Sequence, residues 1–219
     1  MRNIGIRNVG LWRRGVDANK FHPRYFDPNM RDLLTDGHPD DHLLLYVGRL
    51  ATEKQVHQIR AALDQIPNTR LAIVGTGALE AELKQQFAGY PVRFMGNLSG
   101  ELLARAFASS DVFVFPSAFE SFGLVLLEAM ASGTPVVSSR VGGAPNVITE
   151  GKSGYLFDVN DTEGMITGIR RVIESPAKLA QMRIAARTDA ETHSWSAIMD
   201  ELIECYSSVA EQSNRRALA

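Results

Sequence analysis

The sequence predicts an α/β fold built on a Rossmann-like, doubly wound parallel sheet, and three observations support this. Short apolar runs alternate with helical patterns from residue 43 onward, which is typical of repeated βαβ units. Six such runs are expected as strands, each short. The chain of 219 residues is 45% hydrophobic and 22% charged, enough for the core of one large domain or two small ones.

The expected strands are short apolar segments that end at turn-forming residues. The clearest is Val112-Phe113-Val114-Phe115, which stops at Pro116 because proline has no backbone N–H for the ladder. The full set of expected strands is 43–47, 71–74, 92–94, 112–115, 135–138 and 154–157. In such a sheet ligands bind outside the carboxyl ends of the strands, so the loops there are where function is expected.

The expected helices carry apolar residues at helical spacing or are apolar throughout. Val56, Ile59 and Leu63 align on one face of the first, and the segment 124–131 is strongly apolar and is closed by Gly133. The full set of expected helices is 54–65, 78–87, 99–109, 124–131, 161–174, 176–192 and 195–210.

Three regions are expected along the chain. Residues 1–42 have little periodicity and many turn dipeptides, so they are expected to be a hinge or connector that enters the sheet domain from a preceding segment. Residues 43–194 form the sheet domain, and residues 195–219 a final helix and tail. The first residues lack a signal-peptide pattern, and no window reaches the length of a transmembrane helix.

Composition and motif searches exclude several classes of protein. The net charge of −2 gives no bulk basic field for nucleic-acid binding. The single Cys205 cannot form an internal disulfide, which fits a reducing compartment. The five histidines show no metal-ligand spacing, and no D-x-D motif is present, so no metal site is expected.

Nucleotide cofactor motifs are also incomplete. Gly75-Thr76-Gly77 follows an expected strand, but Glu80 stands where a dinucleotide fingerprint needs its third glycine. The chain has no P-loop motif. No cofactor is therefore expected.

Arg49 and Lys54 lie in the loop 48–54, after the first expected strand. Held at a strand end, their side chains could converge on one diphosphate, Arg49 by its planar fork and Lys54 as a point charge. The alternative is an ordinary helix start in which Thr52 caps the helix and Glu53 lies in its first turn.

The segment from Pro116 to Glu128 is the most informative in the chain. Ser121 and Gly123 precede an apolar run, so free backbone N–H groups at a helix N-terminus can bind an anion. Glu128 lies within that apolar helix, where a carboxylate needs a diol, a cation or backbone donors. The alternatives are an ion pair of Glu128 with Arg140, and Glu120 as an exposed loop acid.

Gly142 and Gly143 form a second glycine turn after a strand. Paired glycines either let the backbone approach a ligand closely or simply make a tight turn. The sequence leaves these two interpretations open.

With these loops the sequence resembles the retaining GT-B glycosyltransferases, the glycogen-synthase-like family that uses nucleotide-sugar donors. The resemblance covers the donor-binding, carboxyl-terminal half of that fold, from about residue 15 to residue 195. The E-x7-E pair of Glu120 and Glu128 is its most specific element. The other matching segments are Gly15-Val16-Asp17, Val47-Gly48-Arg49-Leu50, Ile73-Val74-Gly75, Phe94-Met95-Gly96 and Ser110 to Ser117.

The resemblance implies a role for each matching residue. Arg49 and Lys54 would hold the donor diphosphate, Glu120 would contact the transferred sugar, and Glu128 would accept the ribose hydroxyls. The catalytic set would be Glu120, Arg49 and Lys54. The backbone would supply donors to sugar and phosphate at Ser121, Phe122, Gly123 and Leu124, and would contact the base near Leu98.

Within the family, the hinge Leu11-Trp12-Arg13-Arg14-Gly15-Val16-Asp17 resembles that of the sulfoquinovosyltransferases. This implies a UDP-sugar donor, UDP-sulfoquinovose, and a diacylglycerol acceptor. A hexosyltransferase that uses GDP-mannose or UDP-glucose, a nucleotide-sugar epimerase and a non-catalytic nucleotide-sugar binding module remain alternatives.

By the same resemblance the amino-terminal domain that binds the lipid or sugar acceptor is missing here. The chain is therefore expected to be a fragment or a truncated gene product, with apolar surface exposed on its last helix. It is expected in the cytoplasm, or peripherally on a cytoplasmic or plastid membrane face.

Overall fold

A computed structural model describes residues 14–217 of the chain, with side chains as far as Val209. The hinge residues Leu11, Trp12 and Arg13 therefore lie outside the described residues. The sheet has six strands in the order β3-β2-β1-β4-β5-β6. The strands are β1 (His42–Val47), β2 (Thr69–Val74), β3 (Val92–Gly96), β4 (Val112–Phe115), β5 (Val136–Ser139) and β6 (Gly154–Phe157).

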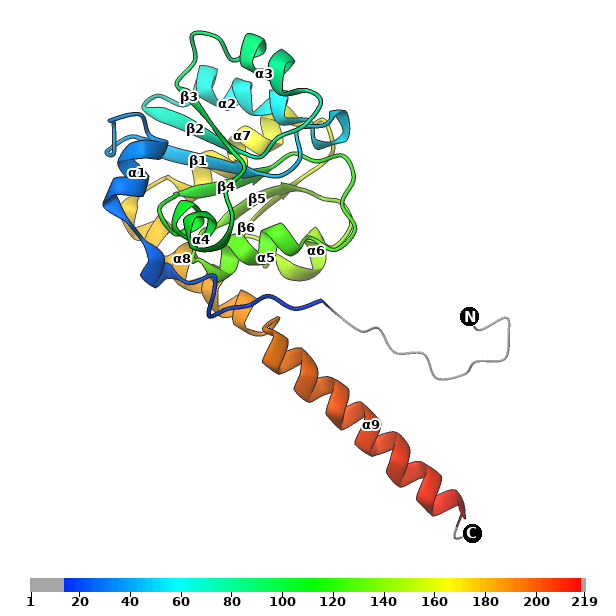
Figure 1. The fold of residues 1–219 in the computed structure, drawn as a ribbon. Coiled ribbons are helices and arrows are strands. Elements are labelled where there is room, and N and C mark those ends of the chain that lie inside the picture. The colour runs from blue at the N-terminus through cyan, green and yellow to red at the C-terminus, as the bar shows by residue number, and fades with distance from the viewer. Residues whose placement is uncertain (1–13, 218–219) are drawn as a thin grey trace.

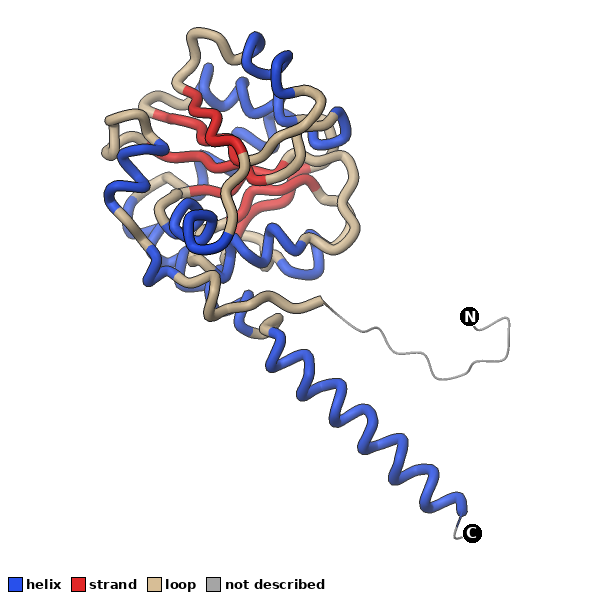
Figure 2. Tube along the Cα trace, in the orientation of Figure 1, coloured by secondary structure: helices blue, strands red, loops and turns tan. Residues whose placement is uncertain are grey.

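All neighbouring strands run parallel, as expected for a doubly wound sheet. Helices cover both faces of the sheet, which lies in the middle of the molecule (Figures 1 and 2). The helices are α1 (Pro28–Leu34), α2 (Arg60–Gln65), α3 (Glu80–Gln86), α4 (Gly100–Ala108), α5 (Leu124–Ala131), α6 (Ala144–Val147), α7 (Thr162–Val172), α8 (Pro176–Glu191) and α9 (Trp195–Ala217).

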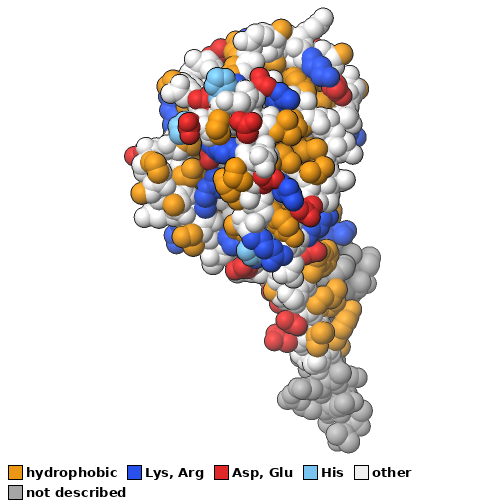
Figure 3. All heavy atoms as spheres, turned by 60° about the vertical axis from the view of Figure 1, so that its left-hand side comes forward, with side chains coloured by type: hydrophobic (Ala, Val, Ile, Leu, Met, Phe, Trp, Pro, Cys, Tyr) orange, Lys and Arg blue, Asp and Glu red, His pale blue; other side chains and the backbone are white. Residues whose placement is uncertain are grey.

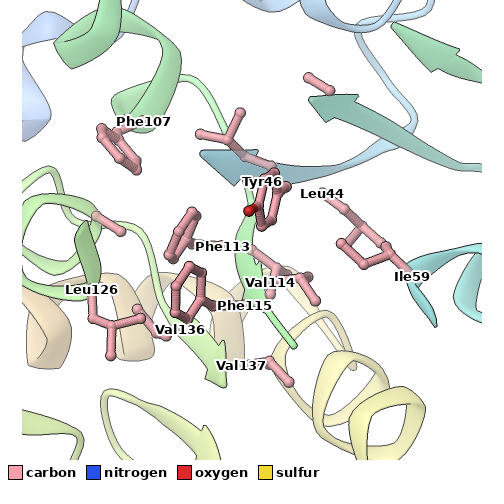
Figure 4. Packing of buried hydrophobic residues seen from close by; sticks show 14 of the residues in the cluster. Leu44, Tyr46, Ile59, Phe107, Phe113, Val114, Phe115, Leu126, Val136 and Val137 are labelled. Carbon is pink, nitrogen blue, oxygen red and sulfur yellow. The ribbon is translucent and has the colours of Figure 1, made fainter. Parts of the chain in front are cut away.

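The core is aromatic on one face of β4. Phe113 and Phe115 point to the same side of the strand, and Phe113 meets Phe107 of α4 edge to face at 5.5 Å (Figure 4). Tyr46 of β1 stacks on Phe115 with ring centroids 6.2 Å apart. Because these rings fill the space between the sheet and its helices, the loops that follow β1 and β4 start from rigid strand ends.

The expected helix over residues 54–65 is wrong in its first half. The chain makes two 3₁₀ turns, Thr52–Lys54 and Val56–Ile59, before α2 begins at Arg60. The interruption is at Gln55, whose left-handed conformation (φ 49°) cannot continue a helix.

Helix α1 was not expected from the sequence. Asp27 accepts a hydrogen bond from the Asn29 N–H as its N-cap, and Pro28 occupies the first turn. Met30 and Leu34 of this helix are buried in the main core, as are Val16 and Phe21.

Helix α9 projects from the domain (Figure 1) and is longer than the expected 195–210. Hydrophobic side chains lie along its described part (Figure 3). Exposed members of this stripe are Met199, Ile203, Tyr206 and Val209. The expected apolar surface on the last helix is therefore present.

Candidate functional site

The predicted catalytic residues Arg49, Lys54 and Glu120 lie in loops that follow β1 and β4. These strands are neighbours in the sheet, and the strand order reverses between them, since β2 and β3 lie on one side and β5 and β6 on the other. Such a topological switch point opens a crevice at the carboxyl ends of the strands.

Main-chain atoms join the two loops. The Ala118 N–H donates to the Glu53 carbonyl oxygen at 2.8 Å, and the Ser117 hydroxyl lies 3.3 Å from the same oxygen. The Ser139 hydroxyl, from the end of β5, donates to the Ser117 carbonyl. The loops therefore hold a fixed relative position without help from their charged side chains.

This arrangement brings Lys54 to Glu120. The Lys54 Nζ lies 3.2 Å from the Glu120 Oε2 and 5.1 Å from the centroid of the Phe115 ring. The side chains of Lys54 and Glu120 are only 16% and 18% exposed, so the pair is shielded from water far more than an ordinary surface ion pair.

The other carboxylate oxygen of Glu120 faces backbone donors that precede α5. The Ser121 N–H donates to Oε1 at 3.0 Å, and the N–H groups of Gly123 and Phe122 do so at 3.3 and 3.4 Å. Burial raises the pKa of Glu120, but the Lys54 charge and these amides outweigh it and the net pKa is lowered. The backbone amides before α5, which were expected to bind an anion, thus already bind the Glu120 carboxylate. The alternative interpretation of Glu120 as an exposed loop acid is therefore wrong.

The ion pair that the Arg49 side chain makes in this structure is with Glu53. Its guanidinium pairs with the Glu53 carboxylate, Nη2 to Oε1 at 2.5 Å, and its side chain is 70% exposed. The backbone of Arg49 is fixed, since its carbonyl accepts from the Tyr46 hydroxyl at 2.9 Å. Thr52 does not cap this segment, because the 3₁₀ turn begins after Ala51 without a side-chain cap.

Glu128 is half-buried in the middle of α5. Burial raises the pKa of its carboxyl, and the charge of Lys20 opposes this only in part. Arg140 instead pairs with Glu150 at 3.2 Å and with Asp158 at 3.7 Å, so the alternative ion pair with Glu128 is wrong. Within residues 14–209 no side-chain hydrogen bond to the Glu128 carboxylate is found.

The remaining predicted donor residues line the start of α5 and the end of β3. Gly123 is the N-cap of α5 and has a left-handed conformation (φ 74°). Phe122 and Leu124 are exposed, and the Arg14 guanidinium lies 5.0 Å from the centroid of the Phe122 ring. Leu98 follows β3 and is half-buried against the core.

The paired glycines allow close contact between loops. A Cβ on Gly142 (φ 52°) would lie 1.7 Å from the Glu120 carbonyl oxygen, and one on Gly143 would lie 2.4 Å from the Phe122 oxygen. Gly75 and Gly77 make the same kind of approach to the loop 48–50. The glycines therefore support the site by letting backbones pack against one another.

The structure adds two residues that sequence reasoning missed. Gln55 and Asn160 both have left-handed backbones, with φ of 49° and 67°, and the Gln55 Nε2 donates to the Asn160 Oδ1 at 2.9 Å. They connect the loop after β1 to the loop after β6. The only signal in the sequence is that asparagine tolerates this conformation better than most residues.

The part of the chain that the structure describes offers neither a metal-binding cluster nor a membrane-spanning helix. Among residues 14–209 no group of three or more His, Cys, Asp or Glu side chains is placed to hold a metal ion. In the same part of the chain no helix combines the length and apolarity that crossing a membrane requires.

Sequence comparison identifies the family. Residues 36–189 match the model of the glycosyl transferases group 1 family, and the chain belongs to this family. Its sheet and helices form the Rossmann-like, carboxyl-terminal half of a GT-B fold, as predicted.

Individual relatives differ in their named substrates. The chain is 40% identical to the sulfoquinovosyl transferase SQD2 of Arabidopsis thaliana over 85% of its own length and 37% of the relative's. It is 35% identical to a GDP-mannose-dependent alpha-mannosyltransferase of Corynebacterium glutamicum, over 98% of this chain and 51% of that one. The chain thus spans 37% and 51% of the length of these two relatives.

A solved structure shows a nucleotide in a similar fold. The Anabaena protein HepE, in complex with UDP and glucose, superposes with a TM-score of 0.76 at 26% identity. The superposition covers 89% of this chain and 55% of HepE.

Proposed function

We propose that this chain binds the nucleotide-sugar donor of a glycosyltransferase, and that the whole enzyme transfers the sugar with retention of anomeric configuration. The observation that carries the proposal is the meeting of Lys54 with Glu120 and the amides before α5. A cation and a row of backbone donors at a topological switch point suit a sugar diphosphate.

Lys54 and Arg49 are proposed to bind the diphosphate. Lys54 is fixed against Glu120 and Phe115, whereas the exposed side chain of Arg49 has room to reorient from Glu53 to a phosphate. As the sugar leaves, negative charge accumulates on the nucleotide. Two cations and preorganised amides stabilise that charge.

Glu120 is proposed to contact the transferred sugar. Its Oε1 holds the amides of Ser121 and Gly123, which are the same donors that the resemblance assigns to sugar and phosphate. A bound donor would therefore compete with the carboxylate for these amides and draw Glu120 toward the sugar hydroxyls.

Glu128 is proposed to accept hydrogen bonds from the ribose hydroxyls. Its carboxyl is half-buried, and its pKa is raised because burial disfavours the charge. A vicinal diol supplies two O–H donors to one carboxylate and would restore the missing solvation. Leu98 is proposed to place its backbone beside the base.

The donor is proposed to be UDP-sulfoquinovose and the acceptor diacylglycerol, as in sulfolipid synthesis. The 40% identity to a sulfoquinovosyl transferase supports this choice, and the HepE complex supports a uridine nucleotide. Since diacylglycerol resides in membranes, the enzyme is proposed to act peripherally on a membrane, with the acceptor bound mainly by a domain outside residues 43–194.

The second candidate is a mannosyltransferase that uses GDP-mannose, favoured by 35% identity over nearly the whole chain. A third is a nucleotide-sugar binding module without transfer activity. The mannosyltransferase would bind a different nucleotide sugar. The binding module would transfer no sugar, whether or not an amino-terminal half is supplied.

Titration calorimetry of the chain with UDP-sulfoquinovose, UDP-glucose and GDP-mannose tests the donor. We expect UDP-sulfoquinovose to bind most tightly, and tighter binding of GDP-mannose would favour the second candidate. Transfer to diacylglycerol is then measured with and without an amino-terminal half supplied in trans. Transfer only upon complementation supports the enzyme, and binding without transfer in either case supports the module.

A further inference from the structure

We propose that Asn160 is a positioning residue for the donor diphosphate, acting through Gln55 to hold Lys54 in place. The proposal rests on the assignment of Lys54 to the donor site. Asn160 lies in the loop after β6, and it belongs neither to the pair of Glu120 and Glu128 nor to the loop 48–54 that carries Arg49 and Lys54. Asn160 does not itself touch the donor.

The contacts of Asn160 reach the segment that carries Lys54. Its Oδ1 accepts from the Gln55 Nε2 at 2.9 Å and from the Gln58 Nε2 at 3.1 Å, and Gln58 also donates to the Gln55 Oε1 at 3.2 Å. Three side chains thus form a closed network. One acceptor oxygen in the loop after β6 anchors two residues that follow Lys54.

The backbone at Gln55 explains why an anchor is needed. The chain leaves the 3₁₀ turn Thr52–Lys54 and enters the next turn through Gln55 in a left-handed conformation, with φ of 49°. A residue other than glycine rarely adopts this conformation, because it brings the Cβ close to the following carbonyl oxygen, and it persists only when surrounding contacts fix it. The hydrogen bond to Asn160 is such a contact, and it acts on the residue next to Lys54.

Fixing the direction of the chain at Gln55 fixes where Lys54 points. The ammonium must stay 3.2 Å from Glu120 and above the Phe115 ring, and a long flexible side chain does so most readily from a rigid backbone. Without the anchor, the turn can relax and the Lys54 ammonium moves away from Glu120. The pKa of Glu120 would then rise, because the Lys54 charge helps to lower it.

The variant Asn160→Gly removes the side chain while keeping a residue that adopts the left-handed backbone freely. Asn68→Gly is the matched control, since Asn68 also has a left-handed backbone (φ 52°) but lies in the turn before β2. Any effect of exchanging a left-handed asparagine for glycine is common to both variants. Only the loss of the hydrogen bonds from Gln55 and Gln58 is specific to Asn160→Gly.

The direct readout is a carbon-13 NMR titration of the Glu120 carboxyl in the chain without ligand. We expect the pKa of Glu120 to be higher in Asn160→Gly than in the wild type and in Asn68→Gly. An unchanged pKa, or an equal rise in both variants, would overturn the positioning role. This readout needs no donor, so its failure is distinguishable from failure of the proposed function.

The second readout is calorimetric affinity for UDP and for uridine. We expect Asn160→Gly to weaken UDP binding about threefold to tenfold, the effect of a lost hydrogen bond, and to leave uridine binding unchanged. Equal losses for both ligands would mean a general structural effect and would also overturn the proposal. Absence of UDP binding to the wild type would refute the proposed donor site, while the titration would still decide whether Asn160 positions Lys54.

Discussion

Lys54 and Glu120 form an ion pair with Nζ and Oε2 3.2 Å apart, although 66 residues separate them in the chain. They meet because their loops follow neighbouring strands, β1 and β4, and because the Glu53 carbonyl accepts a hydrogen bond from Ala118. The charges at the switch point are thus placed by topology and main-chain bonding.

Arg49→Ala should weaken binding of UDP while leaving uridine binding nearly unchanged. A hydrogen bond to a charged group contributes about 1.5–3 kcal/mol, and only UDP offers phosphates to the guanidinium. Titration calorimetry with both ligands measures the difference. Arg60→Ala, at an exposed arginine that lies over the Tyr90 ring, should change neither affinity. Equal losses for UDP and uridine would show that Arg49 does not contact phosphate.

Glu128→Gln should stabilise the fold at neutral pH while weakening UDP binding. Burial raises the pKa of Glu128, so its ionised form opposes folding and stability is lost as pH rises through the folded-state pKa. Relief of about 1 kcal/mol corresponds to a rise of roughly 2–4 °C in Tm. The gain should vanish well below the ordinary glutamate pKa, where the wild-type carboxyl is protonated in both states.

The affinity of the same Glu128→Gln variant for UDP tests the proposed contact with the ribose. Loss of a charge-assisted bond to the ribose should cost about 1–3 kcal/mol, and Glu128→Ala should lose a similar amount. Unchanged affinity in both variants would remove the ribose-binding role of Glu128.

Glu120→Gln should flatten the dependence of stability on acidic pH. The pKa of Glu120 is lowered in the folded chain from its ordinary 4.5. Its stabilising contribution is therefore present above the ordinary pKa and is lost as pH falls through the folded-state value. Thermal unfolding from pH 3 to pH 7 should show the wild type losing more stability than the variant. Glu174→Gln, at an exposed carboxylate beyond α7, should follow the wild type.

Gly142→Ala should damage both stability and UDP binding. Its φ of 52° is unfavourable for alanine, and the added methyl would meet the Glu120 carbonyl oxygen. Gly89→Ala shares the positive φ, at 83°, but its methyl would meet nothing within 4 Å. Gly89→Ala should therefore cost about 1 kcal/mol from backbone strain alone, and Gly142→Ala clearly more, measured by denaturant unfolding. Equal costs would mean that the loop contact contributes nothing.

Much of the fold was predictable because the central strands β1, β2, β4 and β5 are almost wholly buried. The bounds of β4, β6 and α5 match the expected segments, since apolar runs closed by Pro116 or Gly133 leave little ambiguity. The predicted loops do lie at the carboxyl ends of the parallel strands, and their role in donor binding stays a prediction. The pattern of apolar residues could not reveal the break at Gln55, because Val56 and Ile59 are buried as a helix would bury them. Helix α1 was missed although Asp27-Pro28 is a recognised helix start.

The site itself was predictable only in part. The sequence indicated which residue types lie in which loops, but it did not indicate which side chains pair with one another. Arg140 pairs with Glu150 rather than with Glu128, and the anion at the amides before α5 is Glu120. Asn160 approaches Gln55 from more than a hundred residues away, and such contacts depend on the strand order rather than on local pattern.

The hydrogen bond from Ala118 to the Glu53 carbonyl has a practical consequence for protein engineering. Because backbone atoms hold the two loops together, neighbouring side chains such as the exposed Phe119 and Ser121 can be randomised without dislodging Lys54. A combinatorial library at these two positions would be a sound starting point for varying the surroundings of the Lys54–Glu120 pair.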